Sequence, residues 1–116
     1  VSYGVIALIL SIGLRAAALA SIPGPLEGGL ALIAAHAASR GLLAPVVLWL
    51  RPARADGLGA AVGTPGPATA LAAVAIGGLV ALGMLGPWRG GVALLLSGAG
   101  VATMAEMARR RIGGYT

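Results

Sequence analysis

The chain has no cysteine, no lysine and few charged residues of either sign. The absence of cysteine excludes a disulfide scaffold, a zinc–thiolate site and catalysis by a thiol. Only three residues are acidic, Glu27, Asp56 and Glu106, and charged residues make up 9% of the 116 residues. A soluble globule with so few charges could not cover its surface with groups that water solvates, so this class of protein is excluded.

Apolar residues dominate what is present: 59% of the chain is hydrophobic and its mean hydropathy is +0.98. A helix needs about 20 apolar residues to cross the core of a bilayer, so this length allows four crossings with short connections. We therefore predict an all-α integral membrane bundle that forms one unit over residues 1–116. Prolines and glycines divide it into spans of about 3–22, 28–50, 68–87 and 91–108.

Two connections and many small residues complete this outline. Residues 51–67 are rich in glycine, alanine and proline and are predicted to form a long loop, a kind of segment that is usually functional or disordered. The sequence Pro-Trp-Arg-Gly at 87–90 is predicted to be a tight turn. Twenty glycines and many alanines indicate helices that approach one another closely, with Ala16/Ala20 and Gly86/Gly90 as example pairs.

The arginines are distributed unequally between the two predicted membrane faces. Four crossings place both ends of the chain and the 51–67 loop on one face. That face carries five of the eight arginines, and the opposite face carries only Arg89. The positive-inside rule makes the richer face cytoplasmic. Its arginines are Arg51, Arg54, Arg109, Arg110 and Arg111.

Both ends of the sequence are interpreted as internal to a longer protein. Val1 is not an initiator methionine, and no basic segment precedes the first apolar run, so this run is not expected to be a signal peptide. Thr116 follows a glycine pair without a polar tail. We expect a piece of a larger membrane protein that has no turnover by itself.

The second predicted span carries a polar stripe of His36, Ser39 and Arg40. These residues are three and four positions apart, so they lie on or beside one face of a helix. Arg40 lies ten residues before Leu50, about 15 Å along the helix and near the bilayer midplane. One interpretation makes Arg40 a phosphate ligand inside the bundle, with Ser39 and His36 as hydrogen-bonding partners. The alternative is a structural cluster that bonds to backbone carbonyls.

Two other charged residues leave alternatives open. Arg15 interrupts the first span and either reaches the membrane interface or belongs to a site. Glu106 precedes Arg110 by four residues, which favours a helical ion pair near the surface.

Two clusters of arginine followed by glycine lie on the predicted cytoplasmic face, at 54–59 and 109–116. Glycine leaves backbone amides open to close approach by an anion. Basic residues at a helix end also serve as stop-transfer signals and headgroup anchors. Because arginine and glycine recur together on one face, we favour a phosphate-rich substrate there.

Three segments in this order resemble the cobalamin synthases, also called adenosylcobinamide-GDP ribazoletransferases, which are multi-span membrane enzymes. Ser39-Arg40 in a helix that contains proline is similar to the Ser-Arg element of that family. Residues 53–59 (Ala-Arg-Ala-Asp-Gly-Leu-Gly) resemble its Ala-Arg-x-x-Gly-Leu-Gly loop, and residues 110–116 (Arg-Arg-Ile-Gly-Gly-Tyr-Thr) resemble its Arg-Arg-x-Gly-Gly-x-Thr segment. The resemblance covers nearly the whole chain and corresponds to the C-terminal half of the family's length.

The resemblance implies which residues contact substrate phosphates. His36 and Asp56 are implied as supporting residues, and no residue of the chain is assigned as catalytic or as a metal ligand. The implied phosphate-binding residues are Ser39, Arg40, Arg54, Gly57, Gly59, Arg110, Arg111, Gly113, Gly114 and Thr116.

The resemblance also implies the reaction and its setting. The 5′-hydroxyl of α-ribazole, or its phosphate, would attack adenosylcobinamide-GDP and release GMP with the assistance of Mg²⁺, in the inner membrane of a bacterium. The acidic, metal-binding residues of the family lie upstream of the matching segment. The partners implied are these substrates, the lipid bilayer and the upstream helices, with no nucleic acid. The alternatives are a small transporter or channel with an arginine-lined anion path and a membrane phosphatidyltransferase with a lipid acceptor.

Overall fold

The computed structural model describes residues 3–52, 56, 58–61 and 63–114, and every regular element among them is a helix. This confirms the all-α prediction for the described part of the chain. Four of the five helices are long and apolar enough to cross a membrane, as predicted. The helices are α1 (Tyr3–Ala20), α2 (Pro25–Trp49), α3 (Leu58–Ala61), α4 (Pro67–Leu85) and α5 (Pro87–Ile112).

Prolines begin three of these helices, which shifts several boundaries from the predicted ones. Pro25, Pro67 and Pro87 each occupy the start of a helix, where the missing N–H costs no hydrogen bond and the fixed φ suits the helix. The prediction of a tight turn at 87–90 is therefore wrong. Its residues form the first turn of α5, and a single glycine, Gly86 with φ 79°, connects α4 to α5.

The other boundaries differ by a few residues. The first span ends at Ala20 instead of 22, and the second begins at Pro25 instead of 28 and ends at Trp49. The fourth continues to Ile112 instead of 108, so the arginine triplet lies inside the last turn of α5. The 51–67 connection contains α3, a single helical turn that the sequence did not predict.

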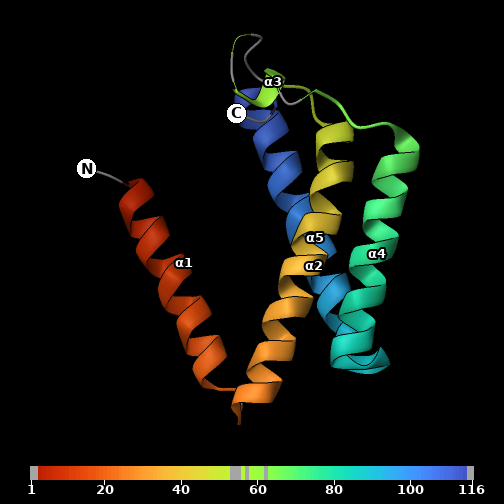
Figure 1. The fold of residues 1–116 in the computed structure, drawn as a ribbon. Coiled ribbons are helices and arrows are strands. Elements are labelled where there is room, and N and C mark those ends of the chain that lie inside the picture. The colour runs from red at the N-terminus through yellow and green to blue at the C-terminus, as the bar shows by residue number, and fades with distance from the viewer. Residues whose placement is uncertain (1–2, 53–55, 57, 62, 115–116) are drawn as a thin grey trace.

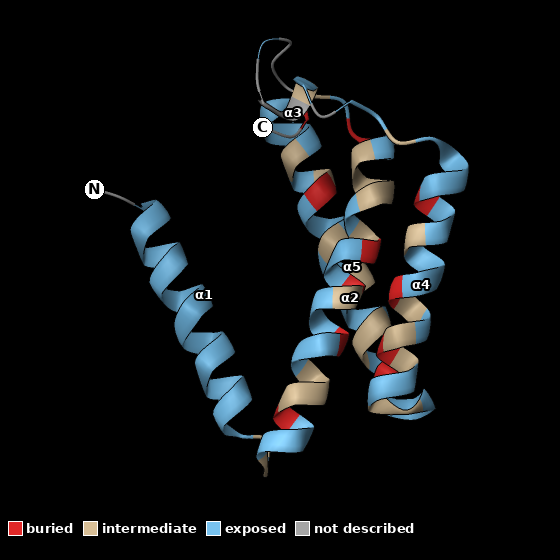
Figure 2. Ribbon diagram, viewed as in Figure 1, coloured by how far each residue is buried: buried red, intermediate tan, exposed pale blue. Residues whose placement is uncertain are grey.

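Helices α2, α4 and α5 pack together, whereas α1 diverges from α2 like one arm of a V (Figure 1). No residue of α1 is buried. Figure 2 shows that the buried positions lie along the inner faces of the other three long helices. These positions hold small residues, among them Ala34, Ala38, Ala70 and Ala81, as expected where helices associate in lipid without a hydrophobic driving force.

The start of α1, helix α3 and the end of α5 lie at one end of the bundle (Figure 1). The α1–α2 and α4–α5 turns lie at the other end. This confirms the predicted arrangement of the ends and of the long loop. We call the first end the arginine-rich end, because its described arginines are Arg51, Arg109, Arg110 and Arg111, whereas Arg89 lies at the opposite end.

Candidate anion-binding site

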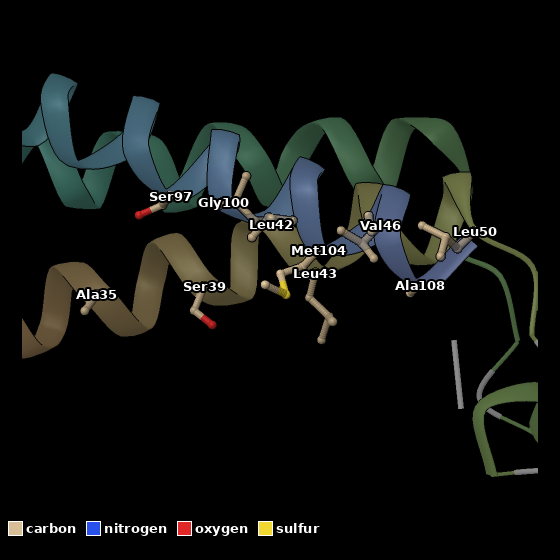
Figure 3. Close-up of a pocket in the computed structure, with 12 residues that line it drawn as sticks. Ala35, Ser39, Leu42, Leu43, Val46, Leu50, Ser97, Gly100, Met104 and Ala108 are labelled. Atoms are coloured by element: carbon tan, nitrogen blue, oxygen red, sulfur yellow. The ribbon is translucent and has the colours of Figure 1, made fainter. Parts of the chain in front are cut away.

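A cavity of about 650 Å³ lies between α2 and α5 (Figure 3). Its lining is almost entirely apolar, and Ser39 and Ser97 supply the only side-chain hydroxyls. The lining extends along α2 from Ala35 to Leu50 and along α5 to Ala108, one residue before the arginine triplet. The cavity therefore connects Ser39 with the arginine-rich end.

A second cavity, of about 410 Å³, lies between α1 and α2. Its polar lining residues are Arg15 from α1 and His36 and Ser39 from α2. Ser39 is thus shared by both cavities. The sequence left the role of Arg15 open, and the structure places it beside two members of the predicted polar stripe.

Arg40 lines neither cavity and its side chain is exposed. Its predicted role as a phosphate ligand inside the bundle therefore stays a prediction for the full-length protein. The closely packed face of α2 is formed by Ala34, Ala38 and Gly41, which recur every three to four residues. Arg40 immediately precedes Gly41 and is rotated by about 100° from it around the helix, so it points away from that face.

His36 forms one hydrogen bond with the backbone of its own helix. Its Nδ1 lies 2.9 Å from the carbonyl oxygen of Leu32, four residues earlier. A carbonyl only accepts, so Nδ1 carries the proton and donates. A hydrogen bond to a backbone carbonyl is what the structural interpretation of the polar stripe predicts. It leaves Nε2 available for a ligand, because no other hydrogen bond of this ring is present among the described residues.

At the arginine-rich end, the carboxylate of Glu106 accepts hydrogen bonds from two arginines of the triplet. Arg109 donates from Nε and from a terminal nitrogen to the two oxygens of Glu106, both at 2.9 Å. Arg110 donates from Nε to Oε1 at 2.6 Å. The predicted Glu106–Arg110 pair is confirmed. The bidentate Arg109 pair was missed, although its i, i+3 spacing is also a helical ion-pair signal.

Arg111 has no ion pair within the part of the chain that the structure describes. Its side chain is exposed in the last turn of α5. Next along the chain, Gly113 adopts the left-handed conformation with φ 76° and donates its N–H to the carbonyl oxygen of Arg109 at 3.2 Å. Gly113 therefore terminates α5, a role that the phosphate interpretation did not include, and Gly114 is buried beside it.

The second arginine–glycine cluster is only partly described. Arg54 and Gly57 lie outside the described residues, as does Thr116 in the first cluster. Gly59 lies in α3, and Asp56 is exposed. Among the described candidates, the structure places His36 and Ser39 together on α2, and it places Arg110 to Gly114 together at the end of α5. About 15 Å of α2 separates Ser39 from Trp49 at the arginine-rich end.

The described residues do not form a site suited to Mg²⁺. This ion takes oxygen ligands, usually one or two carboxylates together with waters and substrate phosphates. No three histidine or acidic side chains of the described residues come together, and Glu106 already accepts from two arginines.

Residues 2–116 match the family model described as cobalamin-5-phosphate synthase. The chain belongs to this family. Its predicted resemblance is confirmed, and the transporter or channel alternative is not supported.

Curated relatives of the family carry the name adenosylcobinamide-GDP ribazoletransferase. The relative from Bradyrhizobium diazoefficiens is 44% identical over 115 residues, which are 99% of this chain and 44% of the relative. The relative from Rhizobium johnstonii is 45% identical in an alignment of 123 residues, gaps included, that covers 99% of this chain and 47% of the relative. The chain thus spans less than half the length of the relatives that it matches. No solved structure matches it.

Proposed function

We propose that the chain is part of a membrane transferase that joins adenosylcobinamide-GDP to α-ribazole, or to its 5′-phosphate, and releases GMP. The observation that carries this proposal is the family match over residues 2–116, together with relatives that bear the name of this transferase. The apolar helices and the exposed arginines at one end suit an enzyme that handles phosphate compounds at a membrane surface.

The leaving group identifies the phosphorus that is attacked. GMP leaves with one phosphate and the bridging oxygen, so the nucleophile attacks the phosphorus that stays esterified to cobinamide. A ribose hydroxyl of the acceptor forms the new P–O bond and loses its proton to a base. The family description names a 5-phosphate product, in which the 5′ oxygen already carries phosphate. The expected attack by the 5′-hydroxyl therefore cannot apply to the phosphorylated acceptor, and another hydroxyl of the ribose must attack.

The arginines supply the charge stabilisation that this transfer needs. Arg110 and Arg111 would bind phosphate oxygens of the donor at the membrane surface, with Arg54, Gly57, Gly59 and Thr116 as predicted neighbours. Arginine binds phosphate oxygens with a planar fork of donors, and such contacts stabilise charge on the transferring group. Gly113 and Gly114 would keep the backbone close to these guanidinium groups.

Mg²⁺ remains a prediction for the full-length protein. When bound, it would neutralise charge on the phosphates. The described residues do not fit it, so we assign it no ligand and derive no step through it. Its carboxylate ligands are expected in the part of the full-length protein that this chain does not include.

The arginine-rich end is proposed to face the cytoplasm of a bacterial inner membrane. Four described arginines at that end against one at the other support this orientation through the positive-inside rule.

The proposal is tested by measuring GMP release from adenosylcobinamide-GDP by the full-length protein in membranes, with and without α-ribazole. Release that depends on α-ribazole is expected, whereas the 116-residue chain alone should give none. Arg40→Ala and Arg54→Ala should each lower the rate. A full-length protein that releases no GMP in the presence of both substrates contradicts the proposed reaction, and unchanged rates in both variants would remove these arginines from the site.

A further inference from the structure

Three polar side chains from two helices line the cavity between α1 and α2. They are Arg15, His36 and Ser39, and the remaining lining residues are alanine, leucine and isoleucine. The three residues are exposed in this chain and share one otherwise apolar space between two helices that are long enough to cross a membrane. Ionisable groups in such positions usually mark functional sites.

The antiparallel course of the two helices makes these side chains converge. Helix α1 runs from the arginine-rich end toward the α1–α2 turn, and α2 runs back (Figure 1). Side chains on an α-helix tilt toward its N-terminus. Arg15 consequently leans toward the arginine-rich end, whereas His36 and Ser39 lean toward the turn. The three side chains thus approach a common level of the bundle from opposite directions.

Arg15 lacks a counter-charge in the described part of the chain. No ion pair or hydrogen bond involves its guanidinium there. Of the chain's acidic residues, Glu106 is bound to Arg109 and Arg110, and Glu27 lies in the first turn of α2, nine residues before His36. An anionic group in the cavity would supply the missing charge.

The available hydrogen-bonding atoms suit a partly protonated oxoanion. The guanidinium of Arg15 and the hydroxyl of Ser39 donate to oxygens. Nδ1 of His36 donates to the carbonyl oxygen of Leu32. In the neutral tautomer that has its proton on Nδ1, Nε2 is an acceptor. A hydrogen phosphate or a phosphomonoester monoanion presents both acceptor oxygens and one O–H donor, which matches this set. A fully ionised carboxylate has no donor for Nε2.

We propose that the cavity between α1 and α2 binds a phosphate group, with Arg15 as its cation and His36 and Ser39 as hydrogen-bonding partners. This site lies about 15 Å along α2 from the arginine-rich end and shares Ser39 with the cavity that reaches that end. Its test does not depend on the transfer reaction proposed above. The phosphate belongs either to a soluble phosphate compound or to a lipid headgroup that is a phosphomonoester, as in phosphatidic acid.

The test measures thermal unfolding of the full-length protein in dodecyl maltoside, a detergent without phosphate. Inorganic phosphate is compared with chloride at equal ionic strength, and phosphatidic acid is added in a separate arm. A ligand that binds the folded state raises the unfolding midpoint, here by about 3 °C at a concentration about ten times Kd. The comparison is made for the unmodified protein, Arg15→Gln and the control Arg89→Gln. Arg89 lies in the first turn of α5 and lines neither cavity.

We expect Arg89→Gln to keep the phosphate shift and Arg15→Gln to lose it. The difference between variants is the readout, because phosphate stabilises many proteins without binding at a site. An Arg15-dependent shift with inorganic phosphate identifies a soluble source, and one with phosphatidic acid alone identifies a lipid; either supports the site. Equal shifts in both variants, or no shift in the unmodified protein, overturn the proposal. If the Arg15→Gln protein unfolds at a lower temperature but keeps the full phosphate shift, Arg15 pairs with a protein carboxylate. That result also overturns the proposal.

His36→Leu provides a second variant in case Arg15→Gln does not fold. It removes Nε2 and should reduce the phosphate shift, and an unchanged shift in this variant counts against the site. GMP release is not part of the readout, so failure of the transfer reaction would leave this result intact.

Discussion

Gly41 of α2 and Gly77 of α4 face each other at a close approach of the two helices. A Cβ built on Gly77 would lie 3.1 Å from the Cα of Gly41 and 2.5 Å from the carbonyl oxygen of Ala37. A Cβ built on Gly41 would lie 2.8 Å from the carbonyl oxygen of Ala73. Neither position has room for a side chain, so the two helix backbones are in direct contact here.

Gly77→Ala in the full-length protein should therefore separate α2 from α4. Overpacking of this kind costs about 1–3 kcal/mol, which outweighs the gain of about 1 kcal/mol from replacing glycine by alanine in a helix. The measurement is the thermal unfolding midpoint in detergent. Gly83→Ala is the control on the same helix, because a Cβ there meets nothing within 4 Å, and it should be neutral or stabilising. Equal effects of the two substitutions would argue against the close approach.

The three arginines of the α5 end should differ in their effect on donor binding. Arg109 uses two donors on Glu106, whereas Arg110 uses one and Arg111 uses none among the described contacts. Arg111→Gln should raise the KM for adenosylcobinamide-GDP about tenfold or more, since a hydrogen bond to a charged group contributes about 1.5–3 kcal/mol. Arg109→Gln should change it least. A larger effect at Arg109 than at Arg111 would show that the ion pair is broken when substrate binds.

Gly113→Ala should loosen the end of α5. The left-handed φ of 76° at this position disfavours a side chain, at about 1–2 kcal/mol, while asparagine tolerates it better. Hydrogen exchange of the backbone amides at Arg110 to Gly113 should accelerate in Gly113→Ala and change less in Gly113→Asn. Gly91→Ala, in the interior of α5 with open space at the Cβ, should leave this exchange unchanged. Equal protection in Gly113→Ala and the unmodified protein would contradict the capping role.

The orientation in the membrane can be measured because the chain has no cysteine of its own. Single cysteines are introduced at Thr64, in the loop at the arginine-rich end, and at Ser21, in the α1–α2 turn; both residues are exposed. In a cysteine-free full-length protein in intact spheroplasts, a membrane-impermeant maleimide should label Ser21→Cys directly. Thr64→Cys should react only after the membrane is opened. The reverse pattern would mean that the arginine-rich end faces outward.

The small-residue faces show what sequence reasoning missed. The spacing of Ala34, Ala38 and Gly41 was visible in the second span, but so were many other alanines and glycines at similar spacings. The pair Ala16/Ala20, which was chosen as an example, lies on α1, where nothing is buried. Of the pair Gly86/Gly90, Gly90 does pack closely, with its Cβ position 2.9 Å from the Cα of Leu82. In a chain so rich in small residues, spacing alone does not identify which face packs.

The sequence by itself determined that the chain has four helices long and apolar enough to cross a membrane and a surplus of arginine at one end. These properties follow from transfer free energies and charges that belong to each segment separately. Only the tertiary structure decided which face of α2 packs against α4, and therefore that Arg40 points away while Arg15 joins His36 and Ser39. That choice depends on how the surfaces of separate helices fit together, and no single segment contains this information.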